Sequence, residues 1–456
     1  MSAKPGDARV RLTGWGRTEP TYAEVTVPQS GDDVAGLVKE AAQVGGVIAR
    51  GLGRSYNNAA QNDGGLVLST SRMTDILSFD ATSGVVVCEA GVSLEQLMVR
   101  CLPDGWFVPV TPGTRQVTVG GAIAADVHGK NHHAAGSFMR HVQSFDLLLA
   151  SGDVRTVTPD GNPELFWGTA GGMGLTGIVL WATVQLKRVE TSSLVVDTVR
   201  TADVDETMAY LSDTDAEYDY TVAWTDCLAT GASLGRSVIT SGNFATVGQL
   251  PRRHQSKPLA FKASSLISAP PVFPSGLLNR STIALANEVW YRKAPRRRVG
   301  EIQTIGTFFH PLDGIKNWNR AYGPAGFRQY QYVVPFEASD VVIRSLERIS
   351  ALRAPSFVTV LKRFGAGDPG PLSFPMPGWT LALDFPSRTP WLSQLLGELD
   401  EMVIGAGGRL YLAKDSRIPA GLMSAMYPRL DDFKRLRAHV DPDGVFGSDL
   451  SRRLAL

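Results

Sequence analysis

The sequence predicts an α+β protein of two domains, and three observations support this class. Residues 32–190 alternate short β-branched runs with helical patterns. After Glu190 the strand-like runs become longer and alternate with amphipathic helical patterns. Glycine-dense segments begin near residues 49, 112 and 171, all ahead of this change. We therefore expect a first domain over residues 1–190, completed by residues 409–456, and a second, mixed α+β domain over residues 191–408.

The elements of the first domain are expected to be short. Its expected helices cover residues 32–44, 94–101 and 164–167. Its expected strands cover residues 47–48, 65–68, 84–88, 146–150 and 154–157. A Gly-Gly pair ends the first helix, and a Ser-Gly-Asp turn joins the last two strands into a hairpin.

The second domain is expected to combine longer strands with amphipathic helices. Its expected strands cover residues 193–199, 218–224, 329–335, 356–364 and 379–385. Its expected helices cover residues 204–212, 339–351 and 390–405. Residues 251–295 are rich in Pro, Ser and Leu without a clear period. Since loops of this length are usually functional or disordered, we expect a mobile loop near residues 251–298, either a surface excursion or an apolar lid.

The composition is that of a globular protein and excludes several classes of partner. The chain has 456 residues, 43% of them hydrophobic and 20% charged, with a net charge of +1. This balance provides no basic field, so nucleic acid is not an expected partner. The basic runs at residues 252–253 and 296–298 are either solvated loop charges or contacts for anionic lipid. The three cysteines give neither a disulfide framework nor a metal-ligand spacing.

We expect neither a signal peptide nor a transmembrane helix. Residues 1–10 are polar and contain no apolar core or twin-arginine signal. A run of about 18 apolar residues, which a membrane span would need, does not occur in the sequence. The expected location is the cytoplasm or a peripheral position on a membrane, its periplasmic face included.

The decapeptide Ala-Arg-Gly-Leu-Gly-Arg-Ser-Tyr-Asn-Asn of residues 49–58 carries the first functional signal. Two glycines one residue apart allow a sharp turn that brings successive N–H groups close to an anion. Arg50 and Arg54 add positive charge, and Ser55 and Asn57 add neutral donors. This chemistry suits a pyrophosphate, and hence a dinucleotide. The spacing is not G-x-G-x-x-G, so the nicotinamide-type fingerprint does not apply.

Two further glycine-dense segments extend this signal. Residues 112–133 place small side chains on both sides of a Gly-Gly pair, which lets a flat ring system lie against the backbone. Residues 171–179 are again rich in glycine and lead into an apolar strand. Together the three segments resemble the vanillyl-alcohol-oxidase type of FAD enzymes, in which the first loop holds the pyrophosphate and the other two line the isoalloxazine. The resemblance implies a PCMH-type FAD-binding fold with a separate substrate domain.

The resemblance also implies which residues contact FAD. They lie in the three glycine-dense segments and in a C-terminal Tyr-Leu-Ala-Lys-Asp-Ser-Arg motif: Ala49, Arg50, Gly51, Leu52, Gly53, Arg54, Ser55, Tyr56, Asn57, Asn58, Ala59, Gly113, Thr118, Val119, Gly120, Gly121, Ala125, Asp126, Val127, His128, Ile178 and Tyr411. Related alditol and aldonolactone oxidases often carry a histidine, as a covalent flavin anchor, where this chain has Arg54. A guanidinium cannot form that bond, so we expect FAD to be non-covalent.

Five longer motifs narrow the resemblance within the family. Residues 12–17, 50–58, 128–133, 319–327 and 411–417 resemble actinobacterial members that oxidise the ribose 2′-hydroxyl of decaprenylphosphoryl-β-D-ribose. The implied product is the 2′-keto intermediate, the first half of an epimerisation to decaprenylphosphoryl-arabinose for cell-wall arabinan. The implied partners are the polyprenylphosphoryl-ribose lipid and an NAD(P)-dependent reductase that acts on the keto product. Two alternatives are an alditol- or aldonolactone-type FAD oxidase and a non-catalytic flavoprotein.

Oxidation of an alcohol requires a base for the hydroxyl proton, and two residues are candidates. Lys414 lies near an expected apolar flavin face, where desolvation would lower its pKa; it could equally hold the hydroxyl or the flavin edge electrostatically. His128 is the other candidate, or only a hydrogen-bond partner. His132 and His133 complete its loop, but no acidic cluster accompanies them, so no metal site is expected.

Substrate contacts are implied mainly on the second domain. Gln329 and Gln331 alternate with tyrosines, so both amides face one side of a strand, toward sugar hydroxyls or toward solvent. Lys130 and Lys362 would meet a phosphate as point charges, or be ordinary surface lysines. The full implied set is Tyr56, Lys130, Trp224, Trp318, Gln329, Gln331, Lys362, Ala382 and Lys414.

The chain departs from the resembled family at a few positions. Many members have a cysteine where this chain has Ala382, before an Asp-Phe-Pro motif. A thiol is not needed for hydride transfer, so we expect activity without it and the loss of an anchor for thiol-directed ligands. Val222 and Phe309 stand where hydroxyl-bearing residues are familiar, which puts some of the family's polar contacts in doubt.

Overall fold

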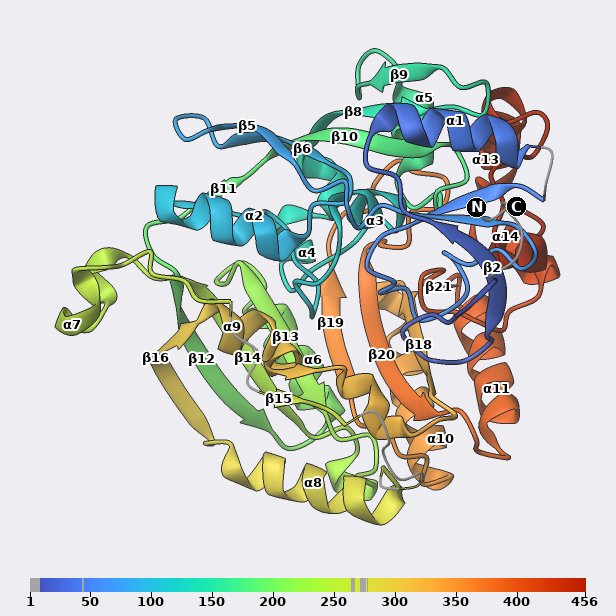
Figure 1. Cartoon of the computed structure of the whole chain (residues 1–456). Coiled ribbons are helices and arrows are strands. Elements are labelled where there is room, and N and C mark those ends of the chain that lie inside the picture. The colour runs from blue at the N-terminus through green and yellow to red at the C-terminus, as the bar shows by residue number, and fades with distance from the viewer. Residues whose placement is uncertain (1–8, 43–44, 264–266, 271–275, 277) are drawn as a thin grey trace.

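Two smaller sheets contain most of the strands of the N-terminal part of the chain (Figure 1). The computed structural model describes residues 9–42, 45–263, 267–270, 276 and 278–456. The four-stranded sheet has the order β1 (Val10–Leu12), β2 (Thr21–Thr26), β4 (Leu66–Ser69), β3 (Val47–Arg50), with β2, β4 and β3 parallel. The antiparallel five-stranded sheet has the order β5 (Ile76–Asp80), β6 (Val85–Glu89), β10 (Ile178–Gln185), β8 (Val142–Leu148), β9 (Val154–Val157).

Helix α1 (Gly31–Ala41) joins these two sheets. Ser30 caps it by accepting from the Asp33 amide, and acidic residues occupy its first turn, as the positive end of a helix favours. Its buried Val34 and Val38 share one core with Leu66 of β4 and Leu148 of β8. The helix thus anchors β3, whose end begins the glycine loop.

An antiparallel sheet of eight strands forms the second part of the fold, in the lower half of Figure 1. Its order is β16 (Arg297–Thr304), β12 (Ser193–Thr201), β14 (Ser237–Phe244), β13 (Tyr220–Thr225), β19 (Thr359–Phe364), β20 (Gly378–Pro386), β18 (Phe327–Val334), β21 (Arg409–Leu410). Helices α6 (Val204–Asp213), α10 (Asp340–Ala351) and α11 (Leu392–Gly405) share a core with this sheet. The expected α+β class is confirmed.

Side-chain alternation gives the large sheet two different faces. The hydroxyl of Tyr332 donates to Ser345 of α10, and the hydroxyl of Tyr330 donates to Asp400 of α11. The tyrosines of β18 therefore point toward the helices. Gln329 and Gln331, which alternate with them, point to the opposite face, as the sequence pattern predicts.

The prediction of a loop near residues 251–298 is wrong for part of that range. Residues 280–293 form helix α8 (Arg280–Lys293). Asn279 caps it by accepting from the Thr282 amide, and the Asn279 amide donates in return to the Thr282 hydroxyl. Only Ile283 and Asn287 of α8 are buried, and Asn287 donates to Asp226 at 2.7 Å. Because the buried face is partly polar, the helix leaves no apolar period in the sequence. Most of the Ala-Pro-Pro-Val-Phe-Pro run lies outside the described residues.

The last part of the chain returns from the eight-stranded sheet to the N-terminal sheets. β21 pairs with β18. Further along the chain, the carbonyl of Val445 accepts from the Val47 amide of β3 at 2.8 Å. Thr21 of β2 contacts Asp449 through its hydroxyl. Within the described residues, the structure contains no helix with the length and apolar character needed to cross a bilayer.

Candidate active site

The glycine loop that follows β3 presents a row of free backbone donors. The N–H groups of residues 52–55 donate to no acceptor within the described part of the chain. Gly53 has φ +63°, a left-handed conformation that glycine adopts without strain. A Cβ on Gly51 would lie 2.3 Å from Oγ1 of Thr118, so only glycine fits there. Successive free amides in such a turn form a cradle for an anion.

Two distant segments hold this loop in place. The Trp15 amide donates to the Ser55 carbonyl at 2.7 Å, and the Gly16 amide donates to that of Tyr56 at 3.0 Å. On the other side, the Tyr56 amide donates to the Ala413 carbonyl at 3.0 Å. The loop is therefore fixed before any ligand binds.

Two side chains expected to serve the anion instead brace the loop. Arg50 donates to the carbonyls of Ala60 at 3.0 Å and Thr13 at 2.7 Å. The Asn57 amide donates to the Leu412 carbonyl at 2.6 Å and contacts that of Asp415. Both side chains are used because buried carbonyls need donors. The backbone amides, and not these side chains, thus provide the donors of the cradle.

Trp15, which precedes the cradle in the sequence, contacts Arg54. Its guanidinium lies 3.9 Å from the ring centre of Trp15 and donates to the Gln116 carbonyl at 3.2 Å. Trp318 packs edge-on against Trp15 at 6.0 Å, so this expected substrate residue lies beside the glycine loop.

The second glycine segment forms a short helix, α3 (Val119–Ala124), capped by Thr118. Thr118 accepts from the Gly121 amide at 3.1 Å, which fixes the Gly-Gly pair against the first loop. The carbonyl of Ala125, just after α3, accepts from the Tyr411 hydroxyl at 2.6 Å. Asp126 and Ile178, by contrast, do not present side chains as ligands: Asp126 bonds to two serines, and Ile178 is buried in the core.

On the large sheet, the face that carries the glutamines aligns three expected substrate residues in one row. Trp224 of β13 registers with Val360 of β19, Val360 with Ala382 of β20, and Ala382 with Gln331 of β18. Directly paired residues in a sheet point to the same face. Both glutamines are buried, which excludes the alternative that they face solvent.

Ala382 gives a prediction for thiol-directed ligands. Because alanine offers no nucleophile and the described cysteines 88, 101 and 227 are buried, such ligands are expected to form no adduct at this sheet. Mass spectrometry of peptides from treated protein checks this, with Ala382→Cys as the variant expected to gain the adduct. A mass shift on residues 379–386 of the unmodified chain would contradict it.

His128 lies at the centre of this face in an apolar surround. Its Nε2 is 3.1 Å from the Gln331 amide nitrogen, which also donates to Thr380 Oγ1 at 3.0 Å. The rings of Phe364 and Tyr411 pack against it at 4.8 and 5.1 Å. Burial, reinforced by neighbouring lysines, holds the pKa of His128 well below its usual range, so the ring is neutral at neutral pH.

Lys362 and Lys414 lie near His128, Lys130 lies near Lys362, and none of the three is an ordinary surface lysine. Burial lowers the pKa of Lys130 to about 7, and burial with the neighbouring Lys414 and Lys130 lowers that of Lys362 to about 7. Lys130 donates to the Phe308 carbonyl, whereas the Nζ of Lys362 is 3.5 Å from the Gly129 carbonyl. Ammonium groups crowded in this way favour an anionic ligand.

The side-chain amine of Lys414 lies between two aromatic rings and donates to no acceptor among the described residues. Its Nζ is 5.4 Å from the ring centre of Tyr56 and 5.9 Å from that of Tyr411. Burial lowers the pKa of Lys414, and the nearby Asp384 opposes that shift. A neutral amine is therefore accessible at moderately alkaline pH, as a general base requires.

Asp384 is a site residue that the sequence argument did not single out. It is buried on the same face of β20 as Ala382, and Gln329 donates to it. Several buried polar atoms around it lack a protein partner among the described residues: Gln329 Oε1, Gln331 Oε1, Asp384 Oδ2, His128 Nδ1 and the Tyr322 hydroxyl. Unpaired buried groups in one place indicate a polar ligand. The signal for Asp384 in the sequence was a single carboxylate within an apolar strand.

Other expected residues lie apart from this centre. Trp224 contacts Trp290 of α8 at 6.3 Å, at the outer end of the row. Gly113 is exposed with open space where a Cβ would be. Phe309 is core, stacked on Phe107 at 5.4 Å, so the missing hydroxyl there costs no contact.

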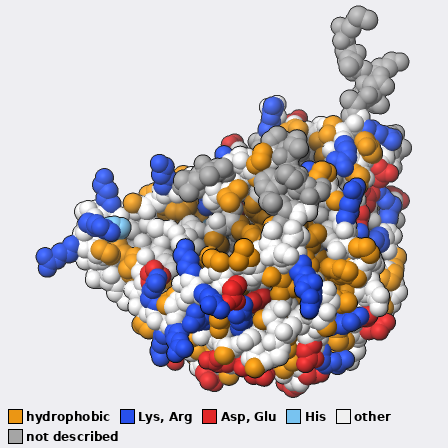
Figure 2. Space-filling view, turned by 90° about the horizontal axis from the view of Figure 1, so that it is seen from below, with side chains coloured by type: hydrophobic (Ala, Val, Ile, Leu, Met, Phe, Trp, Pro, Cys, Tyr) orange, Lys and Arg blue, Asp and Glu red, His pale blue; other side chains and the backbone are white. Residues whose placement is uncertain are grey.

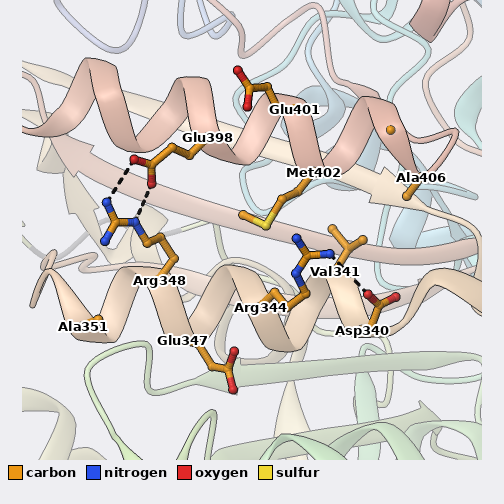
Figure 3. Close-up of a pocket in the computed structure, with 11 residues that line it drawn as sticks. Asp340, Val341, Arg344, Glu347, Arg348, Ala351, Glu398, Glu401, Met402 and Ala406 are labelled. Carbon is orange, nitrogen blue, oxygen red and sulfur yellow. Dashed lines mark hydrogen bonds and ion pairs between the residues drawn. The ribbon is translucent and has the colours of Figure 1, made fainter.

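A groove lies at the surface between α10 and α11, but it is not this site (Figure 3). Both helices contact the tyrosines of β18, on the face opposite to His128. Its charged residues pair with each other: Arg348 donates to Glu398 at 3.0 Å, and Arg344 lies 3.6 Å from Asp340. None of the expected site residues lines it.

Known proteins match both parts of this arrangement. Residues 22–158 match a family model described as an FAD binding domain, and residues 327–454 match one described as D-arabinono-1,4-lactone oxidase. The chain is 50% identical over 450 residues to decaprenylphosphoryl-beta-D-ribose oxidase of Mycolicibacterium smegmatis, covering 98% of this chain and 97% of that protein. It is 45% identical over 374 residues to an uncharacterized protein of Streptomyces coelicolor, covering 80% and 100% of the two chains.

FAD is the cofactor that these matches give to the chain, and the residues fit it. The matched region contains β3, the cradle of free amides and α3. The free amides of the cradle can accept a pyrophosphate. The small residues of α3 and the Tyr411 ring would lie along the flavin.

Proposed function

Since the chain belongs to the family of FAD-dependent oxidoreductases that includes decaprenylphosphoryl-β-D-ribose oxidase, we propose that it oxidises the ribose 2′-hydroxyl of that lipid to a ketone. The observation that carries this proposal is a set of three partly buried lysines, with a neutral histidine and unpaired amide oxygens, beside one face of the large sheet. It offers donors and acceptors to a sugar and positive charge to a phosphate.

The chain's own groups account for the proton and the orientation of the alcohol. Bound FAD supplies the acceptor for the hydride that leaves the carbon. We assign Lys414 as the base, because it has a lowered pKa and its amine has no competing hydrogen bond to the described residues. As the structure places its amide, Gln331 donates to Nε2 of His128, so the lone pair of that ring is occupied. His128 therefore orients the site and does not accept the hydroxyl proton.

Lys362 and Lys130 are assigned to the phosphate. Lys362 has only a long contact of 3.5 Å to a carbonyl and is available for a new partner. An arriving phosphate would raise the lowered pKa values of both lysines and so bind to their charged forms. The amides of Gln329 and Gln331 then face the sugar.

The ketone is the first half of an epimerisation in this proposal. Its reduction from the opposite face would give the arabinose lipid used for cell-wall arabinan, which requires an NAD(P)-dependent reductase as partner. Trapping tests this: borodeuteride added after the reaction is expected to place deuterium at C2′ of both ribose and arabinose products. Deuterium elsewhere on the sugar, or none, would overturn the assignment.

An aldonolactone oxidase is the second candidate, because the C-terminal match carries that description. The partly buried lysines argue against it, since a neutral lactone has no charge for them to meet. Free D-arabinono-1,4-lactone is expected to leave the flavin oxidised under anaerobic conditions. Rapid reduction by the lactone alone would favour the second candidate.

FAD is expected to dissociate when the protein is denatured. The side chain at the position of the covalent anchor is Arg54. Its guanidinium contacts Trp15 and Gln116 and cannot form the covalent bond to the flavin. Acid precipitation is expected to release all yellow colour into the supernatant, as measured by its absorbance. Flavin fluorescence retained on the protein band of a denaturing gel would contradict this.

A lipid substrate requires access from a membrane, and we propose α8 as the contact with an anionic bilayer. Leu285, Val289 and Trp290 of α8 are 67%, 56% and 55% exposed. Exposed arginines at residues 296–298 follow the helix. Figure 2, viewed from the side on which α8 lies in Figure 1, shows basic side chains next to hydrophobic ones. Such a face suits the interface of an anionic membrane.

Vesicle binding tests this contact. The double variant Leu285→Asp, Val289→Asp is expected to reduce co-sedimentation with phosphatidylglycerol vesicles about tenfold or more, since it removes two side chains that would be buried. Leu77→Asp is the control, because Leu77 is 69% exposed on β5, away from α8. Equal loss in both variants, or no loss in the first, would reject α8 as the contact.

A further inference from the structure

Two buried carboxyl groups meet at one serine next to the turn that carries His128. Oδ1 of Asp126 lies 2.6 Å from Oγ of Ser137, and Oδ2 of Asp368 contacts the same oxygen. Asp126 is 0% exposed and the Asp368 side chain 1%. A serine hydroxyl has one proton to donate, so it can satisfy only one of the two carboxylates.

The surrounding groups decide which of the two carboxyl groups carries a proton of its own. Arg140 forms an ion pair with Asp368, which fixes that group as the anion. The groups that face Asp126 are uncharged: the hydroxyls of Ser137 and Ser373, the amide of Met139 and the phenol of Tyr411. His141 is near Asp368 and not Asp126. If Ser137 donates to Asp368, its oxygen must receive a proton from Asp126, because two unprotonated oxygens at 2.6 Å repel.

We propose that Asp126 is a neutral carboxylic acid in the folded protein and that the resulting chain of hydrogen bonds through Ser137 to Asp368 positions the turn before His128. Burial and the charge of Asp368 raise the pKa of Asp126 well above its usual range, which agrees with this assignment. These hydrogen bonds link the turn before His128 to the segment that precedes β20, which contains Asp368 and Ser373.

The backbone shows why this turn needs to be held. Asp126 has φ +42°, an uncommon conformation for a residue with a side chain, and it persists only where surrounding contacts enforce it. Val127 accepts from the Phe138 amide at 2.8 Å, and Ala125 accepts from Tyr411. Loss of the proton would leave two carboxylates competing for the single proton of Ser137, and their repulsion would loosen the turn at its centre.

The sign of the pH dependence follows from the direction of the shift. Folded protein keeps a proton on Asp126 at pH values where the unfolded chain has released it. Stability from this group is therefore complete below the ordinary carboxyl pKa of 3.8 and is lost as the pH rises through the raised value.

Infrared difference spectra test the proposal without any substrate. The spectrum of the FAD-loaded protein minus that of Asp126→Asn is expected to show the C=O stretch of a protonated carboxyl at about pH 6, which fades by about pH 9. Asp368→Asn removes the second charge, so the band is expected to fade at lower pH. A wild-type difference spectrum without the band, or an unchanged band midpoint in Asp368→Asn, would overturn the proposal.

A positioning role adds a second readout. Asp126→Asn keeps a neutral donor toward Ser137 and is expected to retain FAD, whereas Asp126→Ala removes the link and is expected to lose FAD at least tenfold more readily. Between about pH 6 and 9 the melting temperature of wild type is expected to fall by about 2 °C relative to that of Asp126→Asn. Equal FAD retention in both variants would contradict the positioning role.

Discussion

Replacement of Lys414 by alanine is expected to slow flavin reduction by the lipid substrate about 10²- to 10⁴-fold per bound FAD, the range for loss of a general base. Lys414 has the lowered pKa that this role requires, and its amine donates to no acceptor in the part of the chain that the structure describes. Stopped-flow absorbance of the flavin under anaerobic conditions measures the rate directly.

The arginine variant separates a base from a fixed charge at this position. Lys414→Arg keeps the charge but cannot release a proton near neutral pH, so it is expected to be as slow as the alanine variant. In wild type, the rate is expected to rise with pH as the amine loses its proton, with a midpoint below the ordinary lysine value of 10.5. A fast arginine variant with a flat pH profile would assign Lys414 to electrostatic positioning instead.

Gly51→Ala is expected to weaken FAD binding about 100-fold. The added Cβ would lie 2.3 Å from Thr118 Oγ1, which caps α3. Displacing Thr118 combines overpacking with the loss of a helix cap, and the two together cost about 3 kcal/mol of free energy. This cost corresponds to about two factors of ten in the dissociation constant of FAD. Fluorescence titration of the apoprotein with FAD measures the change.

A glycine elsewhere provides the matched control. Gly36 lies in α1 with no atom within 4 Å of an added Cβ, so Gly36→Ala is expected to bind FAD as wild type does. Circular dichroism of both variants separates loss of binding from loss of fold. Unchanged FAD affinity in Gly51→Ala would show that the cradle does not depend on the contact between the two glycine segments.

Local patterns predicted much of the fold. The helix expected over residues 94–101 is α2 (Leu94–Cys101), because its capping box and apolar spacing agree. The alternation of glutamine and tyrosine in β18 correctly predicted a face with amides. By contrast, α8 was missed because its buried residues Ile283 and Asn287 give no apolar stripe.

The candidate site was predictable in kind but not in detail. Spacing alone indicated an anion-binding loop, but it could not show that Arg50 and Asn57 bond to carbonyls far along the chain. Their partners, Thr13 and Leu412, are adjacent only in the fold. Likewise, Ser137 brings Asp126 and Asp368 together across more than 200 positions. No local pattern encodes such a meeting.

The proposed function is tested most directly by the absorbance of the bound flavin in anaerobic protein mixed with decaprenylphosphoryl-β-D-ribose. The flavin is expected to bleach with this lipid and to remain oxidised with the analogue that lacks the 2′-hydroxyl. Bleaching by both lipids, or by neither, would contradict oxidation at the ribose 2′-carbon.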